Sequence, residues 1–182
     1  MALPKILARC MELVLDDSRE MITRVTYTDA QIKALPTTPL TCLPAQSASL
    51  LVIPKWAVVW VKAASGAYTN IDATAFLGFK FATSLNEPMS WVPNDAAITA
   101  GTTTNFTSLF GTANNRRALL LPGFRTENVN EWGLVPSVVT STDGVNQALQ
   151  IYMGNGAAGN LTGGNASNSM IVDFGYVALR VP

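Results

Sequence analysis

Residues 50–62 carry apolar side chains at almost every position, without the usual alternation of apolar and polar residues. Leu, Val and Trp occupy most of the even positions of this run, and Leu, Ile, Ala and Val occupy most of the odd ones. An extended strand with this pattern has two apolar faces, and both need to be covered. We therefore expect a central strand with the domain core on one side and a second element or subunit on the other.

Shorter runs of alternating or apolar residues predict further strands along the rest of the chain. These runs are residues 21–27, 39–44, 74–81, 118–121, 134–141, 145–153 and 170–181. Turns rich in Gly, Pro, Asn and Asp separate them, and Thr142-Asp143-Gly144 is the strongest hairpin signal. About eight short strands at this spacing predict an all-β fold, an antiparallel β-sandwich of jelly-roll type.

Helical signals are few and lie mostly near the start of the chain. Thr28 and Gln31 have the spacing of a capping box, which predicts a short helix through Leu35 that Pro36 ends. Residues 96–112 combine threonines that favour a strand with apolar residues at helical spacing, so both conformations stay open there.

The first 20 residues form an N-terminal arm, separate from a β domain at residues 21–182. Apolar residues recur in the arm at helical spacing, and the polar run at residues 16–20 separates them from the first strand. The apolar stripe could pack on its own domain or on a neighbouring subunit. We select as interface candidates the apolar residues of the arm and two tryptophans of the central strand: Leu3, Ile6, Leu7, Leu13, Val14, Trp56 and Trp60.

Composition narrows the classes of partner. Twelve Lys and Arg balance twelve Asp and Glu, and the only basic doublet is Arg116-Arg117, which argues against nucleic-acid binding. No apolar run reaches the roughly 18 residues that a membrane-spanning helix needs. Only 13% of the residues are charged and 48% are apolar, so we expect self-association, as a homo-oligomer.

Candidate chemistry is sparse. The chain has no histidine, which excludes Ser-His-Asp and Cys-His nucleophiles and most catalytic zinc sites. Residues 154–159 match G-x-G-x-x-G, but no helix follows to hold a pyrophosphate, so we interpret them as a loop. Cys10 and Cys42 form no metal-binding spacing and are expected to be buried, reduced thiols. We therefore predict no catalytic, cofactor-binding or metal-binding residues, and a protein that is not an enzyme.

Four short motifs carry a resemblance to a known group of proteins. They are residues 27–39 (YTDAQIKALPTTP), Ile53-Pro54, residues 66–72 (GAYTNID) and residues 159–168 (GNLTGGNASN). In this order they resemble small virion proteins of tailed bacteriophages, several of which are jelly-roll capsid decoration or cement proteins. The resemblance covers roughly residues 21–181 and leaves out the N-terminal arm.

The resemblance implies a decoration protein on the capsid exterior that is made in the host cytoplasm and implies no catalytic residues. Its partners would be its own copies, expected as a trimer at a threefold position, and the major capsid protein, whose subunits it would bridge. An alternative is a tail or fibre component that binds host glycans through exposed tryptophans and the loop at residues 154–168. An enzyme would instead need two facing carboxylates in one cleft.

Overall fold

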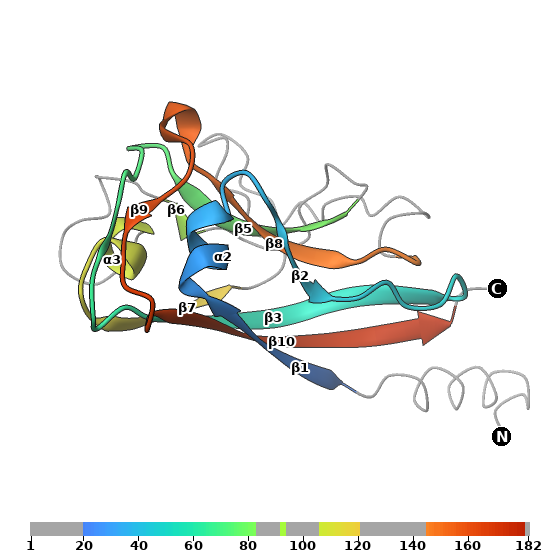
Figure 1. Ribbon diagram of the computed structural model, residues 1–182. Coiled ribbons are helices and arrows are strands. Elements are labelled where there is room, and N and C mark those ends of the chain that lie inside the picture. Colours follow the sequence, from blue (N-terminus) through green and yellow to red (C-terminus); the bar gives the residue numbers. More distant parts are fainter. Residues whose placement is uncertain (1–19, 83–91, 94–105, 121–144, 181–182) are drawn as a thin grey trace, which may run out of the picture.

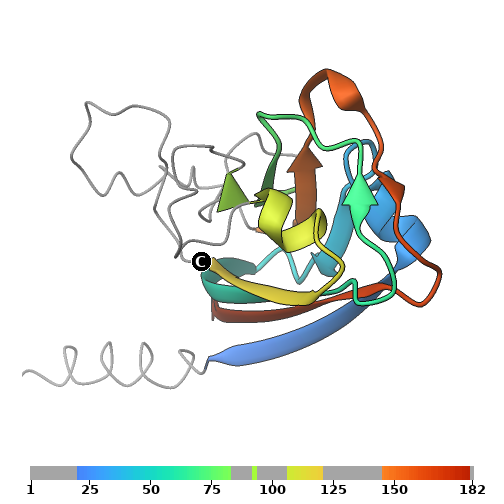
Figure 2. The ribbon, with the colours of Figure 1, turned by 90° about the vertical axis from the view of Figure 1, so that its left-hand side faces the viewer.

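The computed structural model describes residues 20–82, 92–93, 106–120 and 145–180. Two four-stranded antiparallel sheets lie face to face as separate layers (Figures 1 and 2). The first sheet has the strand order β1 (Met21–Thr28), β10 (Ser169–Arg180), β3 (Leu50–Lys62) and β7 (Asn115–Leu120). The second has the order β2 (Leu40–Leu43), β8 (Leu149–Gly154), β5 (Phe76–Phe81) and β6 (Val92–Pro93).

The remaining elements are short. The strands β4 (Tyr68–Thr69) and β9 (Thr162–Gly163) form a two-stranded sheet of their own. Helical elements are α2 (Asp29–Ala34), α3 (Phe106–Phe110) and the 3-10 turn η2 (Gly156–Ala158). No helix in the described ranges is long and apolar enough to cross a membrane.

The order in which the chain visits the two sheets is that of a jelly roll. With the β4–β9 pair set aside, the described strands read 1-8-3-6 in one sheet and 2-7-4-5 in the other, counted along the chain. Eight strands in two sheets with this connectivity define the double-sheet jelly roll. The all-β sandwich predicted from the spacing of turns and apolar runs is confirmed.

Aromatic and aliphatic side chains from the inner faces of both sheets make one core. The ring of Phe79 from β5 stacks on that of Phe174 from β10, with 6.0 Å between the ring centroids. Both side chains are fully buried, as are Val59 of β3 and Ile151 of β8. The two sheets therefore bury their inner faces against each other, and the outer face of each is left to other contacts.

The local signals for the first helix are confirmed. The Thr28 side chain accepts a hydrogen bond from the backbone of Gln31, whose side chain accepts one from the backbone of Thr28, as a capping box requires. Of the segment left open, residues 106–110 are helical. The arm at residues 1–19, the predicted strand at 134–141 and the predicted hairpin turn at 142–144 lie outside the described residues.

The central strand β3 has apolar residues at both even and odd positions because a β-bulge interrupts it. Its partner register on β10 passes from Gly175 opposite Trp56 to Tyr176 opposite Pro54, which leaves Lys55 unpaired as a β-bulge. Buried positions are consequently even before the bulge and odd after it. Assigning all even positions to one face and all odd positions to the other is therefore wrong, because the bulge exchanges the faces halfway along.

Candidate functional site

The outer face of the β1-β10-β3-β7 sheet is built from rows of side chains that run across the strands. The backbone register defines three successive rows. They are Ile22–Gly175–Trp56, then Arg24–Asp173–Val58–Leu119, then Thr26–Ile171–Trp60–Arg117. Neighbours within such a row lie close enough for their side chains to touch.

The first row fixes the position of Trp56. Gly175 lies opposite Trp56 on β10, and a Cβ atom added there would overlap three atoms of the indole ring. The indole therefore packs directly against the glycine backbone. Its Nε1–H donates a hydrogen bond to the carboxylate of Glu20, the residue that precedes β1. The indole is thus held between β10 and the start of β1.

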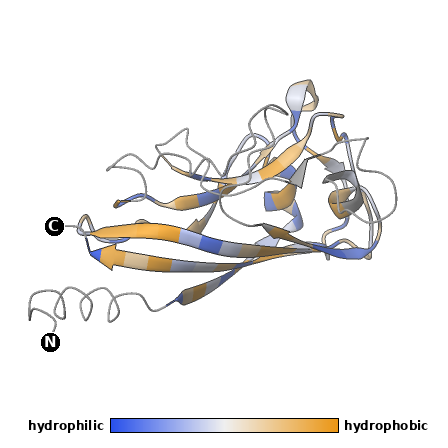
Figure 3. Cartoon of the chain, turned by 180° about the vertical axis from the view of Figure 1, so that it is seen from behind, coloured by the Kyte–Doolittle hydropathy of each residue, from blue (hydrophilic) through white to orange (hydrophobic). Residues whose placement is uncertain are grey.

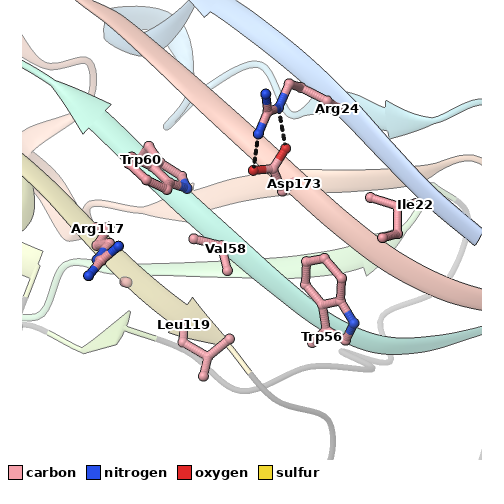
Figure 4. A pocket seen from close by; sticks show the side chains of 9 residues that line it. Ile22, Arg24, Trp56, Val58, Trp60, Arg117, Leu119 and Asp173 are labelled. Carbon is pink, nitrogen blue, oxygen red and sulfur yellow. Dashed lines mark hydrogen bonds and ion pairs between the residues drawn. The ribbon is translucent and has the colours of Figure 1, made fainter.

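The second row carries a paired charge beside apolar residues. The Arg24 guanidinium donates two hydrogen bonds to Asp173, at 2.5 Å from Nε to Oδ1 and 2.8 Å from Nη2 to Oδ2 (Figure 4). The hydrogen bond from Arg24 and its positive charge lower the pKa of Asp173, and the hydrogen bond to Asp173 and its negative charge raise the pKa of Arg24. The pair is charged at neutral pH, with Val58 and Leu119 next to it in the row.

The third row carries the exposed tryptophan. The indole of Trp60 is 38% exposed, and the guanidinium of Arg117 lies 5.4 Å from its ring centroid. This is the geometry of a cation–π contact, which occupies one face of the ring. No acidic side chain in the described part of the chain forms an ion pair with Arg117.

Together these rows line an open groove of about 850 Å³ (Figure 4). Its most exposed apolar side chains are Ile22, at 66%, and Leu119, at 61%. Hydrophobic residues follow the long strands of this sheet over much of their length (Figure 3). Large exposed aliphatic and aromatic side chains next to one another on a flat sheet are typical of a surface that contacts another protein element.

The groove offers contact area rather than an arrangement of reactive groups. Asp173 is the only carboxylate among the described residues that line it, and Arg24 binds that carboxylate. Among the residues described, no three His, Cys, Asp or Glu side chains gather as metal ligands would. The geometry is therefore suited to burying apolar surface, with the Arg24–Asp173 pair and Arg117 setting orientation.

A second cluster, at one end of the sandwich, brings together the sequence motifs that lie far apart in the chain. The side chain of Asn155 accepts a hydrogen bond from the backbone of Asp72 and donates to the carbonyls of Asn70 and Gly159. Asn70, in a left-handed conformation, donates in turn to the carbonyls of Ala158 and Asn160. The amides of the buried Asn155 and the exposed Asn70 therefore tie the loop after β8 to the loop after β4.

Two further contacts extend this loop cluster to the first motif. The Asn168 amide donates to the Gly66 carbonyl at 2.8 Å, and the Thr37 hydroxyl donates to the Asn160 side chain, also at 2.8 Å. The backbone N–H of Leu161 donates to the carbonyl of Lys33 in α2. Three of the four motifs that carry the resemblance thus lie together and are joined by hydrogen bonds.

Sequence reasoning found part of these sites. Trp56 and Trp60, predicted as interface residues, both line the groove. The other predicted interface residues lie outside the described residues: Leu3, Ile6, Leu7, Leu13 and Val14. Cys42 is buried and free, as predicted, whereas Cys10, Trp91 and Trp132 also lie outside the described residues.

Two features of the sites were missed. The outward position of Leu119 follows only from strand register, whereas the alternation along residues 22–27 already groups Ile22 with Arg24 and Thr26 on one face. The burial of Asn155, which is only 4% exposed, has no local signal, because Asn followed by Gly is most often an exposed turn.

No protein-family model matches this chain, and no curated protein matches it at a significant level. The resemblance to small virion proteins therefore stays a prediction, and the function has to be argued from the chain itself.

Proposed function

We propose that this chain is a structural protein of a tailed-bacteriophage virion, a capsid decoration or cement protein. It would sit on the capsid exterior as a homo-oligomer, expected to be a trimer, and bridge subunits of the major capsid protein. The observation that carries the proposal is the apolar outer face of the β1-β10-β3-β7 sheet, with Ile22, Trp60 and Leu119 exposed. A chain with so few charges gains stability when such a face is covered by a protein partner.

The fold and the motifs add independent support. Jelly rolls are recurrent building blocks of viral capsids, although the same fold also serves lectins and cupins, so the fold alone does not decide the function. The motifs of the loop cluster resemble those of small virion proteins. The described residues that line the groove include no pair of facing carboxylates, the arrangement that a glycosidase would use.

The mechanism would be mass action on the assembled shell. Specific contacts between proteins bury about 1,600 Å² in total, and apolar residues at their centre supply most of the affinity. A protein that binds only the assembled shell stabilises the shell by the free energy of that binding.

Counting copies in purified virions tests the proposal directly. Quantitative mass spectrometry should find this chain in hundreds of copies per particle, in a fixed ratio to the major capsid protein. A handful of copies per particle, or none, would overturn the decoration role.

A second test uses the outer face. Leu119→Glu places a charge on the exposed apolar row and should abolish binding to particles that lack the protein, because the row is needed for the homo-oligomer or for its capsid contact. Thr41→Glu, at an exposed position of β2 in the other sheet, is the matched control and should bind normally. Equal binding by both variants would remove the outer face from the proposal.

The alternative, a tail or fibre component that binds host glycans, has one observation in its favour. Trp60 and the Arg24–Asp173 pair place an aromatic ring and hydrogen-bonding groups in one groove, which is a combination that suits sugar rings. It ranks second because Arg117 already covers one face of the Trp60 ring. Glycan binding that disappears in Trp60→Ala, together with a low copy number per virion, would favour it.

A further inference from the structure

We infer that the groove on the outer face of the β1-β10-β3-β7 sheet is the docking site for residues 3–14 of a second copy of this chain. Each subunit would insert its N-terminal apolar stripe into the groove of its neighbour. The inference concerns purified protein in solution, so it holds or fails independently of any virus.

The size of the segment matches the size of the groove. Twelve residues at helical spacing would make a helix about 18 Å long. The three rows of the groove extend about 14 Å along β1, from Ile22 to Thr26. They extend a similar ~14 Å across the four strands, from β1 to β7. One helix laid across the rows would cover the exposed apolar side chains of the groove.

The chemistry of the segment also fits. Its apolar residues form one stripe, made of Leu3, Ile6, Leu7, Cys10, Met11, Leu13 and Val14. Two acidic residues, Asp16 and Asp17, follow the stripe directly, whereas Arg117 in the groove has no ion-pair partner in the described ranges. A helix C-terminus and its flanking carboxylates are both attracted to such a cation.

The point where the segment joins the domain favours a neighbour over the subunit's own groove. Glu20 is held beside Trp56 at the first row, and Leu119 lies three inter-strand spacings away from β1. A helix packs about 10 Å above a sheet, so residues 15–20 would have to span roughly 17 Å to place their own helix over β3 and β7. Six residues reach at most about 20 Å, which leaves almost no slack.

A neighbouring copy faces no such limit. Segments exchanged in one direction from subunit to subunit make head-to-tail contacts, which close into a ring when the rotation between subunits is a third of a turn. This arrangement also accounts for how a chain with 13% charged residues covers its apolar outer face.

Cross-linking between singly substituted full-length chains tests the exchange. All chains carry Cys10→Ser, and Cys42, which is buried, is left in place. One chain also carries Leu7→Cys and the other, with an affinity tag, carries Val58→Cys. Mixed, refolded together and treated with a short bis-maleimide linker, they should give a linked dimer of one tagged and one untagged chain.

Two controls make the result specific. Arg9→Cys in place of Leu7→Cys puts the thiol on the polar side of the segment, and Thr41→Cys in place of Val58→Cys puts it on the other sheet. Neither replacement should give the linked dimer. When Leu7→Cys and Val58→Cys are combined in one chain, the products should be linked oligomers.

Other outcomes overturn the inference. Linked monomers from the combined variant, without mixed dimers, would mean that the segment covers its own groove. Absence of any link would mean that the segment does not occupy the groove. The variant Leu7→Glu gives a second, independent test. Its mass in solution should fall to that of a monomer. The midpoint of urea unfolding of its β domain should stay near that of the same domain in the unsubstituted oligomer. An unchanged oligomer would equally refute the exchange.

Discussion

Gly175→Ala should displace the Trp56 indole and disturb the groove from beneath. The added methyl group would overlap three atoms of the indole, which lies directly on the glycine backbone. The ring cannot move aside without cost, because its Nε1–H is hydrogen-bonded to Glu20. The substitution therefore adds a single methyl group and disturbs mainly one contact, that between residue 175 and the Trp56 indole.

The expected cost follows from what is known of overpacked sites. Forcing an extra methyl group into a filled position destabilises proteins by about 1–3 kcal/mol. In a domain of this size each kcal/mol lowers the melting temperature by about 2–4 °C. Gly175→Ala should therefore lower the melting temperature by about 2–12 °C, unlike an ordinary Gly→Ala change in a strand, which favours Ala by roughly 0.5–1 kcal/mol.

Urea unfolding followed by far-UV circular dichroism, in a double-mutant cycle with Trp56→Ala, isolates the contact. In the Trp56→Ala background the ring is gone, so Gly175→Ala should be neutral or slightly stabilising. The coupling free energy between the two sites should be at least ~1 kcal/mol. If Gly175→Ala costs the same in both backgrounds, the indole does not lie on Gly175 and the account of the first row is wrong.

Three further predictions concern other parts of the fold. Arg24 lowers the pKa of Asp173 in the folded protein below its value in the unfolded chain, which is near 4. The ion pair therefore stabilises the folded protein fully above about pH 4. This stabilisation is lost as the pH falls through the lowered pKa of the folded state. Asp173→Asn should therefore flatten the fall of the urea midpoint below about pH 4. Burial raises the pKa of Cys42 to about 12, so its thiol stays protonated and unreactive at pH 8. In a chain with Cys42 as its only thiol, iodoacetamide at pH 8 should therefore label Cys42 only as fast as the protein unfolds. Fast labelling of the folded protein would contradict this. Asn155→Ala removes three hydrogen bonds to backbone groups and should cost ~2–4 kcal/mol in urea unfolding, whereas the exposed Asn114→Ala should cost almost nothing.

Local patterns in the sequence were sufficient for the longer described strands and for the first helix, whereas the short strands β4 and β9 were not predicted. The alternation at residues 74–81 and 170–181 reports directly which side chains face the core, because successive side chains in a strand point to opposite faces. The capping box at Thr28 needs only residues three positions apart. Features of this kind depend on near neighbours in the chain, so a single sequence contains them.

Structural features that depend on residues far apart in the chain could not be predicted from the sequence. The bulge at Lys55 exists because β3 pairs with β10, more than 100 residues later, with one residue fewer on that side. The burial of Asn155 likewise requires the carbonyl of Asn70 from another loop. Neither register nor such long-range hydrogen bonds can be inferred from local spacing, and both decide how the candidate sites are built.

The loop cluster and the outer sheet face are therefore expected to respond in opposite ways to substitution. In the loop cluster the buried side-chain amides of Asn155 and Asn168 donate hydrogen bonds to backbone carbonyls of the same chain. Substitutions there should therefore lower the stability of the folded domain. The outer face leaves Ile22 and Leu119 more than half exposed, so changes there should act on assembly. It follows that the motifs that suggest kinship report the fold, because they lie in the loop cluster. What the chain binds has to be decided on the sheet face, where the resemblance contributes only Ile53-Pro54, next to the bulge at Lys55.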